Sequence, residues 1–416
     1  MPPPPSIDQD SPQATAGPDE PAEAAEAERP TTLRELAWLF ARLGFTSFGG
    51  PAAHIAMMDD EVVRRRRWMT RERFLDLLGA TNLIPGPNST ELAIHIGHAR
   101  AGWAGLVVAG VCFISPAVAI VTAIAWAYVR FGTLPQLAGV LYGVKPMIIA
   151  VVLQALWGLG RSAVKSYALA AVGLAALAAA LAGVNELVVL AVAGAGVAVG
   201  RGALASGAGR AASWVPVPLL GALSTAGSAG TAVAAAAATT SVGLWPVFAV
   251  FLKVGSVLFG SGYVLLAFLR GDLVDRLHWL TESQLLDAVA VGQITPGPVF
   301  TTATFVGYLI GGGGGAAVAT LGIFLPAFVF VAISGPLVPR IRRSPAAGAA
   351  LDGINVASLA LMAAVTLQLG RAAIVDLPTA ILAVLGAAVL IRYRPNTAWL
   401  VLGGALAGVA LSYGPW

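Results

Sequence analysis

The stretch NLIPGPNSTELAIHIG, residues 82–97, interrupts an apolar region of the chain in an unusual way. Two prolines and a glycine, Pro85, Gly86 and Pro87, stand at its centre, and Asn, Ser, Thr and Glu follow at once. Proline cannot continue a helix, because it lacks a backbone N–H and its ring clashes with the preceding turn. The stretch therefore predicts a helix break inside an apolar segment, with polar side chains gathered at the break.

The composition identifies the setting of this break. The chain of 416 residues is 57% hydrophobic and only 11% charged, whereas soluble globular chains carry about 25% charged residues. Uncharged apolar runs recur that approach the roughly 20 residues needed to span a bilayer. They cover residues 101–129, 134–159 (interrupted by Lys145), 167–181, 187–200, 380–391 and 397–413. We expect an all-α polytopic membrane protein.

Residues 1–30 differ from the rest of the chain. They hold seven acidic residues against one arginine, lack an apolar core, and are rich in proline and alanine. Such a segment cannot bury enough apolar surface to fold, so we expect a disordered tail and no signal peptide. The basic remainder fits cytoplasmic loops that follow the positive-inside rule and, as a second reading, a site that attracts anions. The single cysteine, Cys112, excludes disulfides and cysteine-based metal sites.

The break occurs twice. Residues 85–87 recur as residues 296–298 after 211 positions, and other matches keep the same order. They include Phe48, Gly49 and Gly50 with Phe259, Gly260 and Ser261, Arg42 with Lys253, Asp76 with Asp287 and, at an offset of 210, Gly97 with Gly307, Pro116 with Pro326 and Gly143 with Gly353. The series predicts a tandem duplication of residues 33–203 and 245–413. A low-complexity linker, 204–244, joins the halves and is long enough to add one crossing.

Loop charges indicate how the halves are inserted. Basic residues follow the fourth apolar segment of half one, at 161–165, but the fifth segment of half two, at 392–394. The equivalent loops, near Arg371 and Glu186, lack that basic excess. Because basic loops stay in the cytoplasm, we expect the halves to be inverted relative to each other. The basic loop at 64–67 fits less well, since the segment before it either re-enters or spans.

Inverted repeats with interrupted helices are the signature of secondary transporters, which bind substrate near the midplane, where broken helices leave backbone groups free. After Pro87, Asn88 is a candidate N-cap with Glu91 at the capping-box spacing, and Thr295 is a candidate N-cap in half two. Each half would then point a helix N-terminus at the centre of the protein. Such an end, with its free N–H groups and partial positive charge, favours anions.

Ionisable residues in the apolar segments are candidates for function. Arg42 and Lys253 occupy one repeat position, and we favour contact with the substrate anion over snorkelling from a helix end. Glu91 and His95 lie four residues apart, hence on one helix face. They form either a proton relay or a capping carboxylate with a hydrogen-bonded histidine, and they are too few to bind a metal.

Three further residues leave their roles open. Lys145 matches Asn355, so the repeat does not support a function for it. Thr301 and Thr302 either offer hydroxyl groups to an oxyanion or bond back to their own helix.

Residues 45–97, which begin FTSFGGPAAHI, and their counterpart at 254–312 closely resemble the chromate ion transporter family, in its long members with two fused halves of opposite orientation. The resemblance covers nearly everything from Thr32 to the C-terminus. It implies chromate export across the bacterial inner membrane, energised by the membrane potential or a proton gradient, and chromate resistance. It places the family signature on Phe48, Gly49, Gly50, Pro51, Pro85, Gly86, Pro87, Phe259, Gly260, Pro296, Gly297 and Pro298, with Ser261 where half one has Gly50.

The substrate-binding prediction combines this signature with the cations and the break residues. The candidates are Arg42, Gly49, Gly50, Pro85, Gly86, Pro87, Asn88, Ser89, Lys253, Gly260, Ser261, Pro296, Gly297, Pro298 and Thr301.

Two alternatives remain beside chromate export. Sulfate has nearly the same size, charge and tetrahedral shape as chromate, so the chain could instead carry sulfate or a related oxyanion by uptake or exchange. An intramembrane enzyme that uses Glu91 and His95 belongs to another class, but it gives no reason for the duplication. We expect a chromate or sulfate anion and the lipid bilayer as partners, no nucleic acid, no enzyme activity and no cofactor; a homodimer stays open.

Overall fold

The computed structural model describes residues 31–48, 50–131, 135–205, 242–259, 262, 264–393 and 396–412, and these residues form helices and connecting turns without a strand. The predicted disordered tail, most of the linker with its extra crossing, and the candidates Gly49, Gly260 and Ser261 lie outside the described residues.

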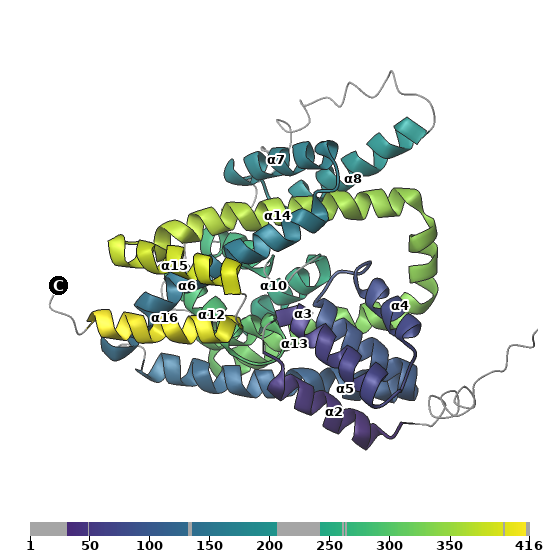
Figure 1. Ribbon diagram of the computed structural model, residues 1–416, viewed down its shortest axis with the longest axis horizontal. Helices are drawn as coiled ribbons and strands as arrows, with labels where there is room; N and C mark the ends of the chain where they lie inside the picture. Colours follow the sequence, from purple (N-terminus) through teal and green to yellow (C-terminus); the bar gives the residue numbers. More distant parts are fainter. Residues whose placement is uncertain are drawn as a thin grey trace, which may run out of the picture.

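The helices of the two halves follow one another in the same order (Figure 1). Half one contains α2 (Leu33–Thr46), α3 (Gly50–Asp59), the π-helix η1 (Asp60–Arg65), α4 (Arg71–Thr81), α5 (Asn88–Phe131), α6 (Pro135–Ala163), α7 (Tyr167–Leu181) and α8 (Glu186–Ala205). Half two contains α10 (Leu244–Val257), α11 (Leu265–Leu269), the π-helix η4 (Arg270–Arg276), α12 (Glu282–Ile294), the 3-10 helix η5 (Val299–Thr301), α13 (Thr302–Arg343), α14 (Pro345–Ala373), α15 (Leu377–Tyr393) and α16 (Thr397–Ser412).

Helices α5 and α13 each contain a sharp turn at equivalent glycines. Gly102 and Gly312 have φ angles of 59° and 58°, in the left-handed region that favours glycine. The first part of α5 folds back onto the second so closely that a Cβ on Gly97 would collide with the Gly105 carbonyl. That first part has roughly 13 residues, about 20 Å, which is too short to cross a hydrocarbon core of about 30 Å. It therefore forms a re-entrant hairpin with α4, with the break between them.

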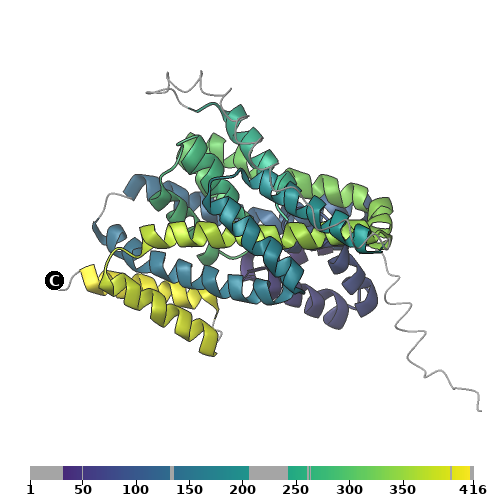
Figure 2. The same ribbon diagram turned by 90° about the horizontal axis from the view of Figure 1, so that it is seen from above.

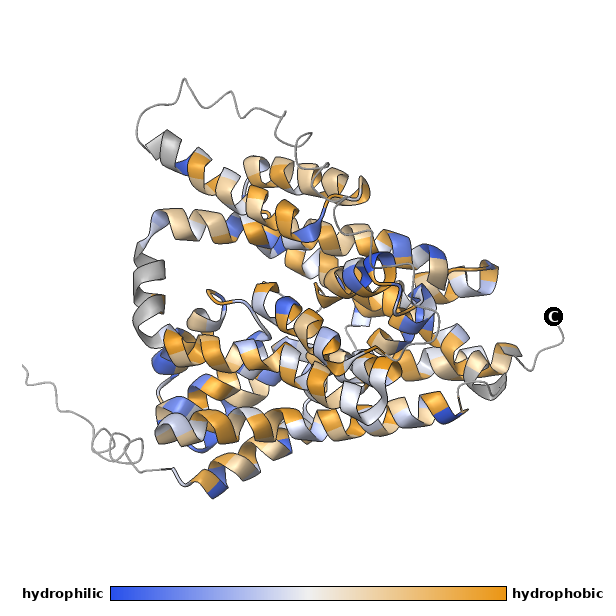
Figure 3. Ribbon diagram, turned by 180° about the vertical axis from the view of Figure 1, so that it is seen from behind, coloured by the Kyte–Doolittle hydropathy of each residue, from blue (hydrophilic) through white to orange (hydrophobic). Residues whose placement is uncertain are grey.

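The long helices are apolar enough to cross a membrane. In the described part of the chain four helices qualify by length and composition: Asn88–Phe131, Ala138–Ala163, Val299–Ser334 and Pro345–Ala373. Figure 3 shows apolar residues along most of the length of the helices, and the exposed side chains include Trp126, Trp157 and Leu321. This surface would be unfavourable in water but suits lipid, so the prediction of an all-α polytopic membrane protein is confirmed.

The two halves are inverted relative to each other. Helices α6 and α14 are repeat equivalents and pack side by side (Figure 2). Lys165, just beyond the C-terminal end of α6, pairs with Asp352 near the N-terminal end of α14 at 2.9 Å. Tyr142, near the N-terminal end of α6, donates a hydrogen bond of 2.6 Å to Asp376, just beyond the end of α14. The two equivalent helices thus run antiparallel, as the loop charges predicted.

The halves also exchange their last helices. Helix α6 of half one packs against α15 and α16 of half two, while α14 of half two packs against α7 and α8 of half one. The broken helices form a second group, in which α5 packs against α13. Because the exchange is reciprocal, neither half can pack its own helices without the other.

The re-entrant hairpins explain the position of the basic loop at 64–67. Arg100 donates a hydrogen bond of 2.7 Å to the Trp68 carbonyl, so this loop and the turn of α5 lie on the same face. From there the second part of α5 crosses to Phe131, and α6 crosses back. Residues 64–67 and 161–165 therefore share one face of the protein, which we call the basic face.

Candidate functional site

The two helix breaks meet at the centre of the protein through a reciprocal pair of hydrogen bonds. The Gly86 N–H donates to the Leu258 carbonyl at 2.8 Å, and the Gly297 N–H donates to the Ser47 carbonyl at 2.9 Å. Donors and acceptors are both repeat equivalents, so each half supplies one of each. The glycines have φ angles of 139° and 87°. A Cβ on Gly86 would also collide with the Glu91 carboxyl group, which explains the residue type at the break.

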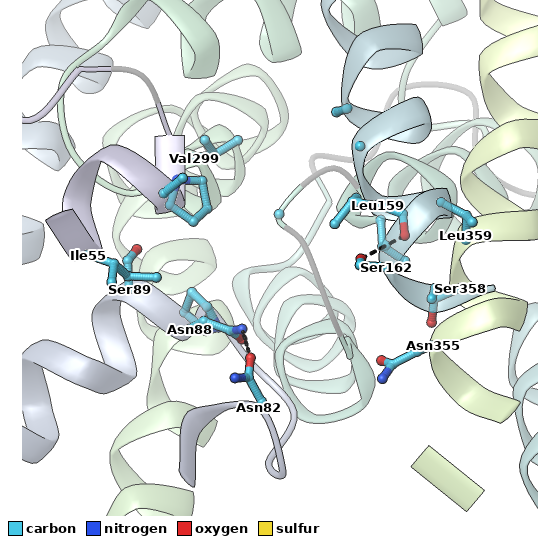
Figure 4. Close-up of a pocket in the computed structure, with 18 of the residues that line it drawn as sticks. Ile55, Asn82, Asn88, Ser89, Leu159, Ser162, Val299, Asn355, Ser358 and Leu359 are labelled. Atoms are coloured by element: carbon cyan, nitrogen blue, oxygen red, sulfur yellow. Dashed lines mark hydrogen bonds between the residues drawn. The ribbon is translucent and has the colours of Figure 1, made fainter. Parts of the chain in front are cut away.

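A cavity of about 770 Å³ lies between these breaks on one side and α6 and α14 on the other. Figure 4 shows Asn82 and Asn88 on one side of the space, with Asn355 and Ser358 on the other. The polar and break residues among its lining are Asn82, Pro87, Asn88, Ser89, Gln154, Ser162, Lys165, Pro298, Asp352, Asn355, Ser358, Asn396 and Thr397. Apolar side chains such as Ile84 and Phe300 line the rest of the cavity, which is formed by both halves.

The break of half one presents the N-terminus of α5 to this cavity. Pro87, Asn88 and Ser89 all line it. Asn88 donates a hydrogen bond of 2.8 Å to the Asn82 side chain, and His54 lies 3.1 Å from the Ser89 hydroxyl group. The first N–H groups of a helix have no partners within the helix, and they carry its partial positive charge. This end of the cavity can therefore bind an anion through uncharged donors.

The opening of the cavity carries a cluster of three charges. Asp352 accepts from Lys165 at 2.9 Å and from Arg201 at 2.7 Å. Lys165 and Asp352 line the cavity, as do Asn396, just before α16, and Thr397, the first residue of α16. The cluster has one more positive than negative charge, so it attracts anions. Because Lys165 follows α6 directly, the cavity opens at the basic face.

The predicted cations Arg42 and Lys253 lie elsewhere. Arg42 pairs with Glu61, and Lys253 pairs with Asp272, with one Nζ–Oδ1 distance of 2.6 Å. Glu61 and Asp272 are repeat equivalents, so the ion pair occurs once in each half. Neither cation is among the described residues that line the central cavity. Each instead binds the first helix of its half to the π-helix that follows.

Glu91 and His95 lie on the buried face of α5. Glu91 is 0% exposed, and among the described residues neither of its carboxyl oxygens has a hydrogen-bond partner. The His95 Nε2 atom is likewise buried without one. The predicted capping box is wrong, because Asn88 is already the first helical residue and its side chain turns to Asn82.

The threonines of half two bond locally. The predicted N-cap role of Thr295 is wrong, because this residue ends α12 and its hydroxyl donates to the Val291 carbonyl at 2.9 Å. Thr301 and Thr302 donate to the carbonyls of Pro298 and Val299, both at 2.8 Å. These hydroxyl groups bond back to their own turn.

The cavity contains only part of the predicted site and adds residues that sequence reasoning missed. Of the predicted candidates within the described residues, Pro87, Asn88, Ser89 and Pro298 line it. Gln154, Ser162, Asn355 and Ser358 were missed. The available signal was a polar side chain inside a long apolar helix, which carries a cost in lipid unless it faces protein or water. The described residues contain no cluster of His, Cys, Asp and Glu that could hold a metal ion.

Comparison with known proteins identifies the family. The family model described as Chromate transporter matches residues 34–199 and 245–409, one match in each half. A chromate transport protein of Cupriavidus metallidurans is 33% identical over 94% of this chain and 96% of its own length. A probable chromate transport protein of Synechococcus elongatus is 31% identical, covering 91% and 95% of the two chains. A chromate transport protein of Pseudomonas aeruginosa is 30% identical over 91% of this chain and 92% of its own length.

No solved structure matches this chain. The family model covers most of both halves, and the relatives are similar over nearly their whole length. Together with the inverted helical repeat, these matches show that the chain belongs to the chromate transporter family.

Proposed function

We propose that the protein exports chromate across the bacterial inner membrane and so confers chromate resistance. The observation that carries the proposal is the position of the cavity, which lies at the meeting point of the two helix breaks and is lined by Pro87 and Pro298. Interrupted helices of inverted repeats form the substrate sites of secondary transporters. The relatives named as chromate transport proteins support chromate as the substrate.

The anion binds at the end of the cavity formed by the N-terminus of α5. Asn82, Asn88 and Ser89 supply side-chain donors there, and the first turn of α5 supplies backbone N–H groups. Gln154 and Asn355 approach from α6 and α14. Amide and hydroxyl donors suit an oxyanion, because they stabilise its charge without holding it as tightly as a fixed cation would. A transporter must release its substrate as well as bind it.

The state described here receives the anion from the cytoplasm. The cavity opens at the basic face, where Lys165 and Arg201 exceed Asp352 by one charge. The positive-inside rule assigns basic loops to the cytoplasmic side. A positive opening on that side raises the local concentration of a dianion before it binds. This arrangement supports capture of the anion from the cytoplasm, which is the first step of export.

Glu91 and His95 are the candidate groups for proton coupling. A buried carboxylate without a partner is strongly disfavoured, whereas the protonated carboxyl group is neutral and fits the site. Glu91 lies against Gly86 at the break, one helical turn from His95. His54, on α3, lies against Ser89, and Arg73 and His98 lie near enough to His95 for an electrostatic interaction. Protonation of Glu91 would therefore remove a negative charge directly beside the place where the anion binds.

Flux measurements in vesicles test the proposal. Inverted vesicles that contain the protein should accumulate labelled chromate, and vesicles with Asn88→Ala and Ser89→Ala together should do so with a higher half-saturating concentration. Competition by excess sulfate separates the alternative: complete competition with equal affinity would favour a general oxyanion carrier. Absence of chromate flux in vesicles with normal amounts of protein would refute chromate export.

A further inference from the structure

The two halves adopt different conformations around the cavity. In half two, α12 packs against α6, α14 and α16. Its repeat equivalent, α4, packs mainly against α5 and α13, and the cavity lies between the end of α4 and α14. The equivalent aspartates show the difference directly, because Asp287 on α12 is 2% exposed whereas Asp76 on α4 is exposed. The hairpin of half two is closed, because α12 packs against α6, α14 and α16. The hairpin of half one is open, because the cavity separates the end of α4 from α14.

A polar cluster holds the closed side together. Lys145 of α6 lies 3.3 Å from Asp287 Oδ1 and donates a hydrogen bond of 2.6 Å to the Ser283 hydroxyl group. Tyr128 of α5 donates to the other oxygen of Asp287 at 2.8 Å. These contacts connect α12 to α6 and to α5. They lie toward the end of α6 that begins at Pro135, and thus toward the face opposite the basic face.

Repeat symmetry relates this closed cluster to the open cavity. Lys145 is the equivalent of Asn355, which lines the cavity now, and Tyr142 is the equivalent of Asp352, which lies at its opening. An inverted-repeat transporter can reach its opposite-facing state when the two halves exchange conformations. In that state α12 separates from α6 as α4 is now separated from α14. Lys145 then occupies the position relative to the cavity that Asn355 occupies here.

We propose that Lys145 is a substrate-contact residue of the opposite-facing state. In the present state Asp287 neutralises the ammonium group of Lys145. Their contact holds α12 against α6 and so keeps the face opposite the basic face closed. When α12 moves away, Lys145 is released into the cavity and contacts the oxyanion with a full positive charge. The inference rests on the proposed oxyanion transport and adds a binding residue that differs between the two sides of the membrane.

This role differs from that of a purely structural ion pair. If the pair only stabilised the fold, replacing both partners by apolar residues of similar size would be neutral or favourable, because neither charge would be left unpaired. If Lys145 contacts the anion, the same replacement restores packing but not affinity. The two roles therefore predict different results for one double variant.

The experiment measures half-saturating chromate concentrations separately from each face, in inverted and right-side-out vesicles. Lys145→Gln should raise the value at the face opposite the basic face by at least about tenfold, as expected for loss of a charge-assisted contact, and change the other by less than about twofold. Lys145→Arg should restore most of the affinity. The double variant Lys145→Met with Asp287→Leu should restore protein amount but keep the weakened affinity.

A matched control is Arg270→Gln. Arg270 is another largely buried cation that pairs with an acidic residue of α12, Glu282, at 2.5 Å, but it does not belong to the cluster. It should leave half-saturation unchanged at both faces. Normal half-saturation at both faces in the double variant would overturn the proposal and leave Lys145 as a structural residue.

A second measurement does not depend on chromate flux. In a Cys112→Ala background, Ala290→Cys, one turn after Asp287 on α12 and only 3% exposed in the present state, should react with a membrane-impermeant thiol reagent only from the face opposite the basic face. Asp287→Asn should increase that reaction, because it weakens the closed cluster. Lack of flux in the unmodified protein would refute oxyanion transport, whereas absence of thiol reaction from that face in a protein that transports would refute the opening inferred here.

Discussion

The N–H of Gly297 lies 2.9 Å from the carbonyl oxygen of Ser47, and this hydrogen bond joins the helix break of half two to the C-terminal end of α2 in half one. Its counterpart joins Gly86 to Leu258. Both bonds satisfy backbone groups that a broken helix leaves without partners inside an apolar protein. The two breaks therefore stabilise each other, and a substitution that disturbs one break should destabilise both.

Gly297→Ala should destabilise the protein and abolish transport. The φ angle of 87° is unfavourable for alanine, and the added Cβ would lie 2.8 Å from the Ala117 Cβ and 3.0 Å from the Gly44 carbonyl oxygen. Backbone strain of this kind costs about 1–3 kcal/mol. The measurements are thermal unfolding in detergent and chromate flux per inserted molecule.

Gly403→Ala is the control for this change, because its Cβ would meet no atom within 4 Å. Because Gly403 lies inside α16 and alanine has the higher helix propensity, this change should leave stability unchanged or raise it by up to about 1 kcal/mol. Equal stability of the two variants would contradict the close approach at the break.

Much of the architecture could be predicted because it leaves regular traces in the sequence. The prolines at 85–87 and 296–298 mark both breaks, the constant offset reveals the duplication, and loop charges reveal the inversion. These signals depend on local backbone chemistry or on the membrane, so they do not require knowledge of the packing.

The cavity residues could not be predicted because they depend on contacts between distant segments. Asn355 and Gln154 face the breaks across the cavity because α14 and α6 of the two halves pack side by side, which no local pattern reports. Arg42 was assigned to the anion because its partner Glu61 lies beyond a chain reversal and within a π-helix. Lys145 appeared unsupported by the repeat, since Asn355 is not charged, yet its pairing becomes informative once the asymmetry of the two halves is known.

The arrangement of the loops predicts a specific topology. Reporter fusions near 161–165 and 392–394 should both be cytoplasmic, since the cavity opening is lined by Lys165 together with Asn396. Fusions near Arg371 and near Glu186 should be on the opposite side. A result that places equivalent loops of the two halves on the same side would contradict the inverted repeat.

The ion pairs of Arg42 and Lys253 predict a structural effect of their removal. Arg42→Gln removes the shortest ion pair of Glu61, which is 7% exposed, and leaves it the longer contacts with Arg65 and Arg66, both at 3.4 Å, so less protein should reach the membrane. Among the described residues, Lys253→Gln likewise leaves Asp272 paired with Arg276 alone, at 2.8 Å. The inserted protein should keep a half-saturating chromate concentration within about twofold of normal. A rise of about tenfold or more in both variants, measured per inserted molecule, would instead support direct contact with the anion.

Glu91→Gln should separate transport from the proton gradient while leaving the fold intact. The site surrounding Glu91 is fully buried and offers no hydrogen-bond partner to either oxygen among the described residues, so a neutral group of the same shape fits it. If proton release from Glu91 accompanies anion movement, the variant retains chromate flux driven by the membrane potential but loses the additional flux produced by a pH gradient. The measurement is chromate uptake into inverted vesicles with the two driving forces imposed separately.

Glu186→Gln is the control, because Glu186 is a partly exposed carboxyl group that lies against Gly271, away from the breaks. It should respond to the pH gradient as the unmodified protein does. An unchanged response in Glu91→Gln would show that the buried carboxyl group carries no proton in the cycle.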